Sequence, residues 1–163
     1  MELSGKSSVV TGGVQGIGRA IALCLARKGS DVAVMDLKDE GVEDLLSELK
    51  ALGGKALFVK ANVSSASDVE RAAREILESF GKVDILINNA GITKDGLVLR
   101  MDEKDWDAVI DVNLKGTFNC TKAFLREMLK RRNGRIVNVS SVIGFIGNTG
   151  QANYAASKAG VVG

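Results

Sequence analysis

The chain has 163 residues, a formal net charge of +2 and 45% hydrophobic residues, which is the composition of an ordinary globular domain with one core. The small charge argues against a nucleic-acid partner, and no apolar run approaches the roughly 18 residues that a membrane span needs. Because the chain has no histidine and only two cysteines, a zinc site and a Ser-His-Asp triad are excluded.

Five short apolar runs are predicted to form strands, at residues 6–11, 31–36, 55–61, 83–88 and 135–140. Their apolar residues are continuous, which is typical of parallel strands covered on both faces. Segments with helical periodicity separate them. This alternation predicts a single α/β domain over residues 1–163, with a Rossmann-like, doubly wound parallel sheet between two helical layers.

The first predicted helix begins near Ile17 and places Ile21, Cys24 and Leu25 on its buried face. Cys120 likewise lies among apolar positions of a later helix. We therefore expect both cysteines to be buried free thiols, which fits a reducing, cytoplasmic location.

Two later helices have recognisable ends. Ser65 or Ser67 can cap the helix that follows the third strand. Asp102 opens a long helical region, and a basic last turn precedes its expected stop at Asn133 and Gly134.

Three glycines lie at the junction between the first strand and the first helix, namely Gly12, Gly16 and Gly18. Their spacing is G-x-x-x-G-x-G instead of G-x-G-x-x-G. Glycine lets the backbone approach a pyrophosphate, and a helix N-terminus supplies N–H donors and positive potential. The motif predicts a dinucleotide site, and a tight turn that serves packing alone is the alternative.

Asp36 ends the second strand, 24 residues after Gly12, close to the spacing of about 20 residues expected for a ribose-binding acid. Its carboxylate would accept from ribose hydroxyls and repel a 2′-phosphate, which favours NAD over NADP. Gln15 agrees, since a basic residue in that loop would suit a phosphate. Lys38 and Lys6 keep NADP open as the alternative, as does the interpretation of Asp36 as a turn residue.

Near the C-terminal end, Tyr154 and Lys158 are spaced i, i+4, so a helix places them on one face. An ammonium held near a phenol stabilises the phenolate. Tyr154 is therefore a candidate general acid/base in a chain without histidine. Taken alone, such a pair is more often an ordinary surface contact on a helix.

Taken together, the ordered motifs resemble the classical short-chain dehydrogenase/reductase family. The motifs are Thr11–Gly18, Asn88–Gly91, Asn113, Ser141 thirteen residues before Tyr154, and Tyr154-x-x-x-Lys158. Within that family, residues 92–96, 99–101 and 147–154 are most similar to bacterial 3-oxoacyl-[acyl-carrier-protein] reductases.

The resemblance implies an NAD(P)-dependent reduction of a ketone to a secondary alcohol. Tyr154 is expected to donate a proton to the substrate carbonyl oxygen, and Ser141 to hydrogen-bond the developing oxyanion. Lys158 is expected to support Tyr154 and to bind the nicotinamide ribose. Asn113 is expected to interrupt the long helix and hold a water that resupplies protons through Lys158.

The resemblance also implies the residues that contact the cofactor. Asn62 occupies a position where the family usually has Asp, and its amide oxygen is expected to keep the adenine contact. The full expected set is Gly12, Gln15, Gly16, Ile17, Gly18, Asp36, Asn62, Val63, Asn89, Ala90, Gly91, Tyr154 and Lys158.

The implied partners are a small or carrier-bound 3-oxoacyl substrate and further copies of the chain, as a homodimer or homotetramer. Gln151 is expected near the substrate. Arg132 is the candidate docking residue for an acidic carrier protein, although the run from Lys130 to Arg132 can also be a charge cluster that complements the helix dipole.

The pattern further predicts that the family's C-terminal third is missing, since five strands are present where a doubly wound fold has at least six. The lack of proline fits this. We expect an open sheet edge at the fifth strand, weak NAD binding and poor ketone reduction by the 163 residues alone. The alternatives are another short-chain alcohol dehydrogenase (for acyl-CoA, sugars or steroids) and a non-catalytic nucleotide-binding or dimerisation module.

Overall fold

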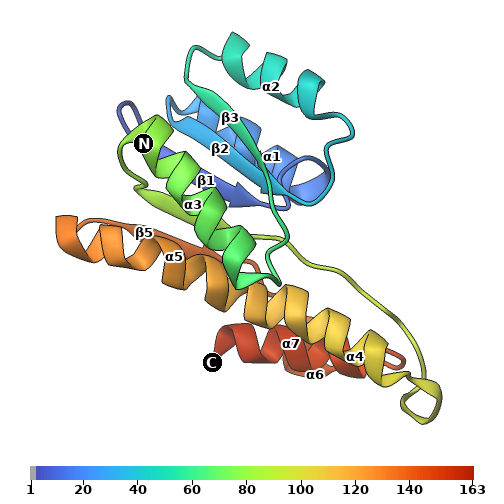
Figure 1. The fold of residues 1–163 in the computed structure, drawn as a ribbon. Helices are drawn as coiled ribbons and strands as arrows, with labels where there is room; N and C mark the ends of the chain where they lie inside the picture. The colour runs from blue at the N-terminus through green and yellow to red at the C-terminus, as the bar shows by residue number, and fades with distance from the viewer. Residues whose placement is uncertain (1–2) are drawn as a thin grey trace.

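The computed structural model describes residues 3–163, and five parallel strands in this part of the chain form a sheet of order β3-β2-β1-β4-β5 (Figure 1). The strands are β1 (Ser7–Thr11), β2 (Asp31–Asp36), β3 (Ala56–Lys60), β4 (Ile85–Asn88) and β5 (Arg135–Asn138). The strand order reverses between β1 and β4, which opens a crevice at their carboxyl ends. The predicted doubly wound α/β fold is confirmed.

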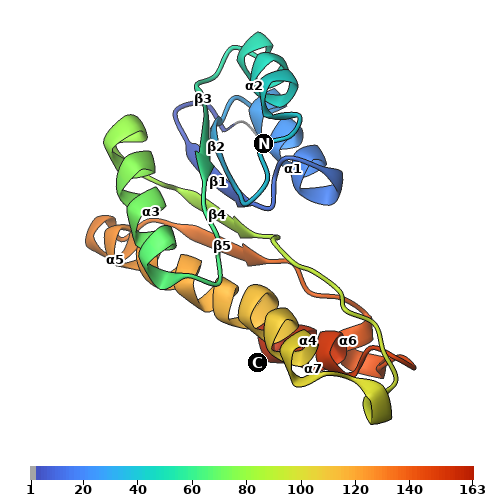
Figure 2. The ribbon, with the colours of Figure 1, turned by 45° about the vertical axis from the view of Figure 1, so that its right-hand side comes forward.

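Helices cover both faces of the sheet, which Figure 2 shows nearly edge-on. Val9 packs with Phe124 in the core on one face, and Val10 packs with Leu45 in the core on the other. Successive residues of β1 thus supply both cores, which explains its continuous apolar sequence. One face carries α1 (Gly16–Arg27) and α2 (Val42–Ala51), and the other carries α3 (Ala66–Phe80) and α5 (Gly116–Arg131).

The long helical region opens after Asp102, as predicted, and contains an irregularity. It comprises α4 (Glu103–Ile110), a π-helical turn (Asp111–Lys115) and α5. Two short helices, α6 (Ile143–Ile146) and α7 (Ala152–Val162), lie beside α4 (Figure 1). Neither α6 nor the 3₁₀ turn Val98–Arg100 was predicted, because each has too few residues to show a period.

The predicted buried face of α1 is wrong at Cys24 only, since Ile21 and Leu25 are partly buried and pack against the core. Ala22 and Ala26 are buried against the sheet, whereas Cys24 is exposed. Residues four apart share a helix face, and the small alanines let α1 approach the sheet closely. Cys120 on α5 is buried as expected, and its desolvation raises the pKa of the thiol to about 12.

The predicted stop of the long helix is also one residue late. Arg132 has φ 51° and forms the left-handed C-cap of α5. The residues that were expected to end the helix, Asn133 and Gly134, follow this cap. The amide of Asn133 donates to the carbonyl oxygen of Met128 at 3.1 Å. Gly134 is needed for packing instead, because a Cβ there would lie 2.6 Å from Met128 Sδ.

β5 forms an open edge of the sheet. Among the described residues it pairs with β4 alone, and Val137, which lies beside Ile87 on the α1 and α2 face of the sheet, is 49% exposed. The open edge agrees with the prediction for the fifth strand. Between residues 3 and 163, no helix combines the length and apolarity that a membrane crossing requires.

Candidate active site

The loop after β1 forms a tight turn in which two glycines are required. Gly12 has φ 63°, and a Cβ on it would lie 2.8 Å from Ala90 Cα. A Cβ on Gly18 would lie 2.1 Å from the carbonyl oxygen of Gly12. Gly16, at φ 56°, begins α1 and faces open space. The first turn of α1, whose N–H groups have no acceptor within the helix, therefore lies beside this space.

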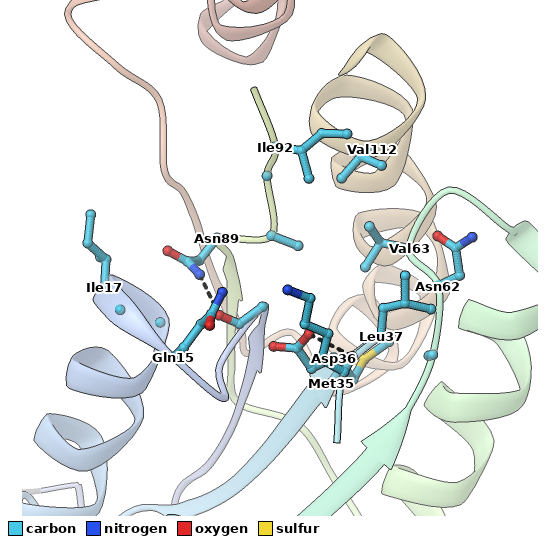
Figure 3. Close-up of a pocket in the computed structure, with 17 residues that line it drawn as sticks. Gln15, Ile17, Met35, Asp36, Leu37, Asn62, Val63, Asn89, Ile92 and Val112 are labelled. Carbon is cyan, nitrogen blue, oxygen red and sulfur yellow. Dashed lines mark hydrogen bonds between the residues drawn. The ribbon is translucent and has the colours of Figure 1, made fainter. Parts of the chain in front are cut away.

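Side chains tie the carboxyl ends of β1 and β4 together. Thr11 Oγ1 accepts from the amides of Asn89 and Ala90, both at 3.0 Å. Asn89 Nδ2 donates in turn to the carbonyl oxygen of Thr11 at 2.9 Å and to that of Gly12 at 3.0 Å, the second of which is drawn in Figure 3. These bonds fix the segment after β4 against the glycine turn.

A pocket of about 410 Å³ lies across these strand ends (Figure 3). It brings together the eleven residues outside α7 that were predicted for the cofactor, namely Gly12, Gln15, Gly16, Ile17, Gly18, Asp36, Asn62, Val63, Asn89, Ala90 and Gly91. It also includes Lys38, which was noted only as favouring NADP, and residues that the sequence did not single out, namely Met35, Leu37, Ala61, Ile92 and Val112. Most of these residues are next to a predicted residue in the chain, and this adjacency is the sequence feature that could have identified them.

Two polar side chains of the pocket are engaged by their own loops. Asp36 accepts from the amides of Val14 at 3.1 Å and Lys38 at 3.2 Å, which fixes the direction of its carboxylate. Asn62 Oδ1 accepts from the amide of Ser64 at 3.0 Å and from its hydroxyl at 2.8 Å. The amide oxygen that was expected to meet adenine is thus already bonded to Ser64.

On α7, Tyr154 and Lys158 lie on one face, and Lys158 Nζ is 5.8 Å from the centre of the Tyr154 ring. Lys158 is 5% exposed, and desolvation lowers the pKa of its ammonium. Nζ donates to the carbonyl oxygen of Val139, just after β5, at 2.7 Å. A buried ammonium beside a phenol is the arrangement that stabilises a phenolate.

Asn113 lies in the π-helical turn and is 1% exposed. Its Oδ1 accepts from the amide of Ile92 at 2.8 Å, and its Nδ2 donates to the carbonyl oxygen of Ile92 and to Ser157 Oγ, both at 3.0 Å. The predicted interruption of the helix is therefore present. The side chain connects the segment after β4 to α7.

Gly91 is where the pocket meets these buried groups. A Cβ built on Gly91 would lie 3.3 Å from Asn113 Oδ1 and 3.6 Å from Lys158 Nζ. The wall of the pocket at the end of β4 is thus within side-chain reach of the Lys158 ammonium.

Ser141 begins the turn into α6, where its Oγ accepts from the amide of Ile143 at 3.2 Å. A hydroxyl that accepts one bond can still donate its own proton. A Cβ on Gly144 would lie 2.8 Å from both Ala159 N and the carbonyl carbon of Lys158. Glycine at this position lets α6, and with it the turn of Ser141, lie directly against α7.

The two candidate docking residues do not line the pocket. Arg132 is exposed at the end of α5 that lies away from α6 and α7 in both ribbon views (Figures 1 and 2). Gln151 precedes α7, and its Nε2 donates to both carboxylate oxygens of Asp95 at 3.2 Å. Its Oε1 accepts from Asn148 Nδ2 at 2.9 Å.

The sequence is similar to those of known reductases along its whole length. Relatives with the name 3-oxoacyl-[acyl-carrier-protein] reductase FabG are 48% identical over 163 residues in Thermotoga maritima and 50% identical over 159 residues in Staphylococcus aureus strain Mu50. The alignments cover 100% and 97% of this chain but 66% and 65% of those proteins.

A crystal structure of a proposed short-chain alcohol dehydrogenase from Sinorhizobium meliloti 1021 superposes with a TM-score of 0.95 at 35% identity, and the match covers 99% of this chain and 64% of that chain. The chain therefore spans about two thirds of the length of these relatives. The protein-family profile described as short chain dehydrogenase matches residues 6–163. On this match and these identities, the chain belongs to the short chain dehydrogenase family.

Proposed function

We propose that this chain supplies the dinucleotide-binding and catalytic groups of an NAD(P)-dependent reductase that converts a ketone to a secondary alcohol. The observation that carries the proposal is the convergence at Gly91. There a Cβ built on Gly91, which lines the pocket, would lie 3.6 Å from the Lys158 ammonium, which itself lies 5.8 Å from the centre of the Tyr154 ring.

The pocket has the form that an extended dinucleotide requires. Pyrophosphate would lie at the first turn of α1, where Gly16 and Ile17 leave the backbone accessible. The adenosine ribose would be bound by Asp36, and the nicotinamide half would extend along Asn89, Ala90 and Gly91. When bound, a reduced nicotinamide supplies a hydride.

The side chains of this chain then handle the proton. The Tyr154 hydroxyl donates its proton to the substrate carbonyl oxygen as hydride reaches the carbon, and Ser141 donates a hydrogen bond to the same oxygen. The Lys158 ammonium stabilises the phenolate left on Tyr154. Asn113 keeps the segment after β4 in place beside Lys158 through both of its bonds to Ile92.

The proposed substrate is a 3-oxoacyl thioester on an acyl carrier protein. The FabG names of relatives at 48% and 50% identity support this choice over acyl-CoA, sugar or steroid ketones. The preferred cofactor is NAD(H), because Asp36 presents a carboxylate where NADP would place a phosphate. Lys38 in the same pocket is the feature that favours NADP(H) as the alternative.

The proposed assembly is a homodimer or homotetramer formed through α5. Phe118, Leu125 and Leu129 are 60%, 38% and 66% exposed and follow one face of that helix. Exposed apolar residues that follow one another along a helix are characteristic of a subunit interface. Lys122, Arg126 and Lys130 flank them.

The proposal is tested with the purified chain, a 3-oxoacyl carrier thioester and either NADH or NADPH. Consumption of the reduced cofactor by wild type but not by Tyr154→Phe supports the reductase. Trp106 is the only tryptophan, so energy transfer from it to NADH measures binding independently of turnover. Binding without turnover would favour the non-catalytic nucleotide-binding module.

A further inference from the structure

The helix that carries Tyr154 and Lys158 has a second polar row, one residue earlier. Asn153 and Ser157 are also spaced i, i+4, so they share a face that is turned by about 100° from that of Tyr154 and Lys158. Both are 0% exposed. Two fully buried polar side chains on an 11-residue helix need hydrogen-bond partners, and both have them.

Asn153 connects three segments. Its Nδ2 donates to the carbonyl oxygen of Lys94 at 2.9 Å and to that of Asp105 at 3.3 Å. Its Oδ1 accepts from the amide of Tyr154 at 2.8 Å. The start of α7 is thereby bonded to the segment after β4 and to the first turn of α4.

The bond from the amide of Tyr154 to Asn153 satisfies a backbone donor at the start of α7. The first intrahelical bond runs from Ala155 to Gln151, so the amide of Tyr154 has no acceptor in the helix. A capping side chain normally supplies one, but Gln151 at the N-cap position makes no such bond. Asn153 takes this role, and so acts directly on the main chain of Tyr154.

Ser157 anchors the same face one turn later. Its hydroxyl accepts from Asn113 Nδ2 at 3.0 Å and donates to the carbonyl oxygen of Tyr154 at 2.8 Å. The amide of Tyr154 is therefore bonded to Asn153 and its carbonyl to Ser157. The main chain of Tyr154 is fixed on both sides.

We propose that Asn153 is a positioning residue that, with Ser157, fixes the rotation of α7 so that Tyr154 and Lys158 face the pocket. The proposal concerns the orientation of the Tyr154 ring and rests on the proposed function only for its kinetic consequence. Asn153 itself acts through Tyr154 and contributes no reacting atom.

The test uses the fact that Tyr154 is the only tyrosine. In the whole chain with ¹³C-labelled tyrosine rings, every ring signal belongs to Tyr154. Wild type should give one ordered set with cross-relaxation to the Lys158 side chain. Asn153→Ala should broaden or split that set and weaken the contact to Lys158. In turnover, kcat should fall about 10- to 100-fold while the KM for the dinucleotide changes less than about twofold.

Three further variants make the test specific. Asn153→Asp keeps the acceptor for Tyr154 but cannot donate to Lys94 and Asp105, so it should behave no better than alanine. Asn153→Ser keeps a short hydroxyl that can donate and accept, and it replaces Asn153→Ala in the same measurements if the alanine variant does not fold. Asn119→Ala is the matched control, since Asn119 is also buried and donates to a main-chain carbonyl, that of Val63, at 2.9 Å. It should lose stability without moving the Tyr154 signals.

Unchanged ring signals and unchanged kcat in Asn153→Ala would overturn the proposal, as would a wild-type spectrum for Asn153→Asp. If wild type lacks reductase activity but its Tyr154 signals respond to Asn153 as described, the proposed function fails and the positioning role stands.

Discussion

The Lys158 ammonium lies 5.8 Å from the centre of the Tyr154 ring, and it is buried with the carbonyl oxygen of Val139 as its hydrogen-bond acceptor. Removing a cation from water destabilises a fold unless an anion compensates. The pKa of Lys158 is accordingly lowered by desolvation. The group therefore weakens the fold at the place where the proposed chemistry needs it.

Lys158→Met should consequently separate stability from function. Ketone reduction should fall by about 10²- to 10⁴-fold, while the urea midpoint at neutral pH should rise. In wild type the folded state binds fewer protons than the unfolded state between the lowered pKa and 10.5, so its stability should increase with pH through that window. The methionine variant should lack this increase. A drop in both midpoint and activity would contradict the argument.

At the opposite ends of the strands, Asp84 is a second buried charge, and it is compensated. Desolvation opposes its ionisation, but the amide of Ser7 at 3.1 Å, Arg131 at 3.0 Å and Lys82 at 3.3 Å outweigh it and lower the pKa of Asp84. Since that pKa is depressed, the stabilisation is complete above about 3.8 and is lost as the pH falls through the folded value.

Asp84→Asn should therefore lower the free energy of unfolding by about 1–3 kcal/mol at pH 7 and flatten its decline in acid. Urea titrations between neutral and acidic pH measure both effects. Glu75→Gln is the matched control, because the Arg71–Glu75 pair is about half exposed and should contribute less than about 1 kcal/mol. If the free energy of unfolding falls equally in acid for wild type and Asp84→Asn, the fall is caused by other carboxylates.

The strands and the sheet type were predicted because they depend on local periodicity. The glycine spacing and the resemblance to the family predicted eleven of the residues that line the pocket. It did not predict the exposure of Cys24, since two overlapping apolar faces of α1 can each meet the sheet and packing of the small residues Ala22 and Ala26 decides between them. Nor did it predict that Arg132 ends α5, where Asn133 and Gly134 are better suited to a left-handed cap.

Residues of the site that act through long-range bonds were also beyond sequence reasoning. Asn153 contacts Lys94 and Asp105, which are 59 and 48 positions away. Its adjacency to Tyr154 was visible, but its burial was not. Similarly, the oxygen of Asn62 was expected to be available to adenine, and the bond from Ser64 two residues later takes it.

Cofactor preference should depend on the charge of Asp36 and not merely on its bonds to the loop. Asp36→Asn keeps an acceptor for the amide of Val14 but removes the negative charge, whereas Asp36→Ala removes both. Both variants should shift the ratio of kcat/KM for NADH over NADPH towards NADPH by about fivefold or more, since one unit charge at contact is worth at least about 1 kcal/mol. A shift in neither variant would mean that Asp36 serves only the turn.

The exposed apolar face of α5 should bring two chains together. Leu129→Glu places a charge on a residue that is 66% exposed, so it should dissociate the assembly without unfolding the chain. Sedimentation velocity at several protein concentrations measures the change. Leu99→Glu is the control, because Leu99 is 99% exposed on the turn before α4. The same loss of association in both variants would assign the effect to net charge.

Arg132 allows docking to be separated from folding, because its conformation is strained. An arginine at φ 51° costs roughly 1–2 kcal/mol relative to glycine, so Arg132→Gly should stabilise the chain while it removes the guanidinium. If Arg132 docks an acidic carrier protein, Arg132→Gly should reduce turnover of the carrier-bound substrate in spite of the higher unfolding midpoint, and Arg132→Glu should reduce it further. Neither variant should alter turnover of a small-molecule ketone. A lost docking contact can lower turnover only when the substrate is bound to the carrier. Equal losses on both substrates would therefore contradict the docking role and leave Arg132 only as the C-cap of α5.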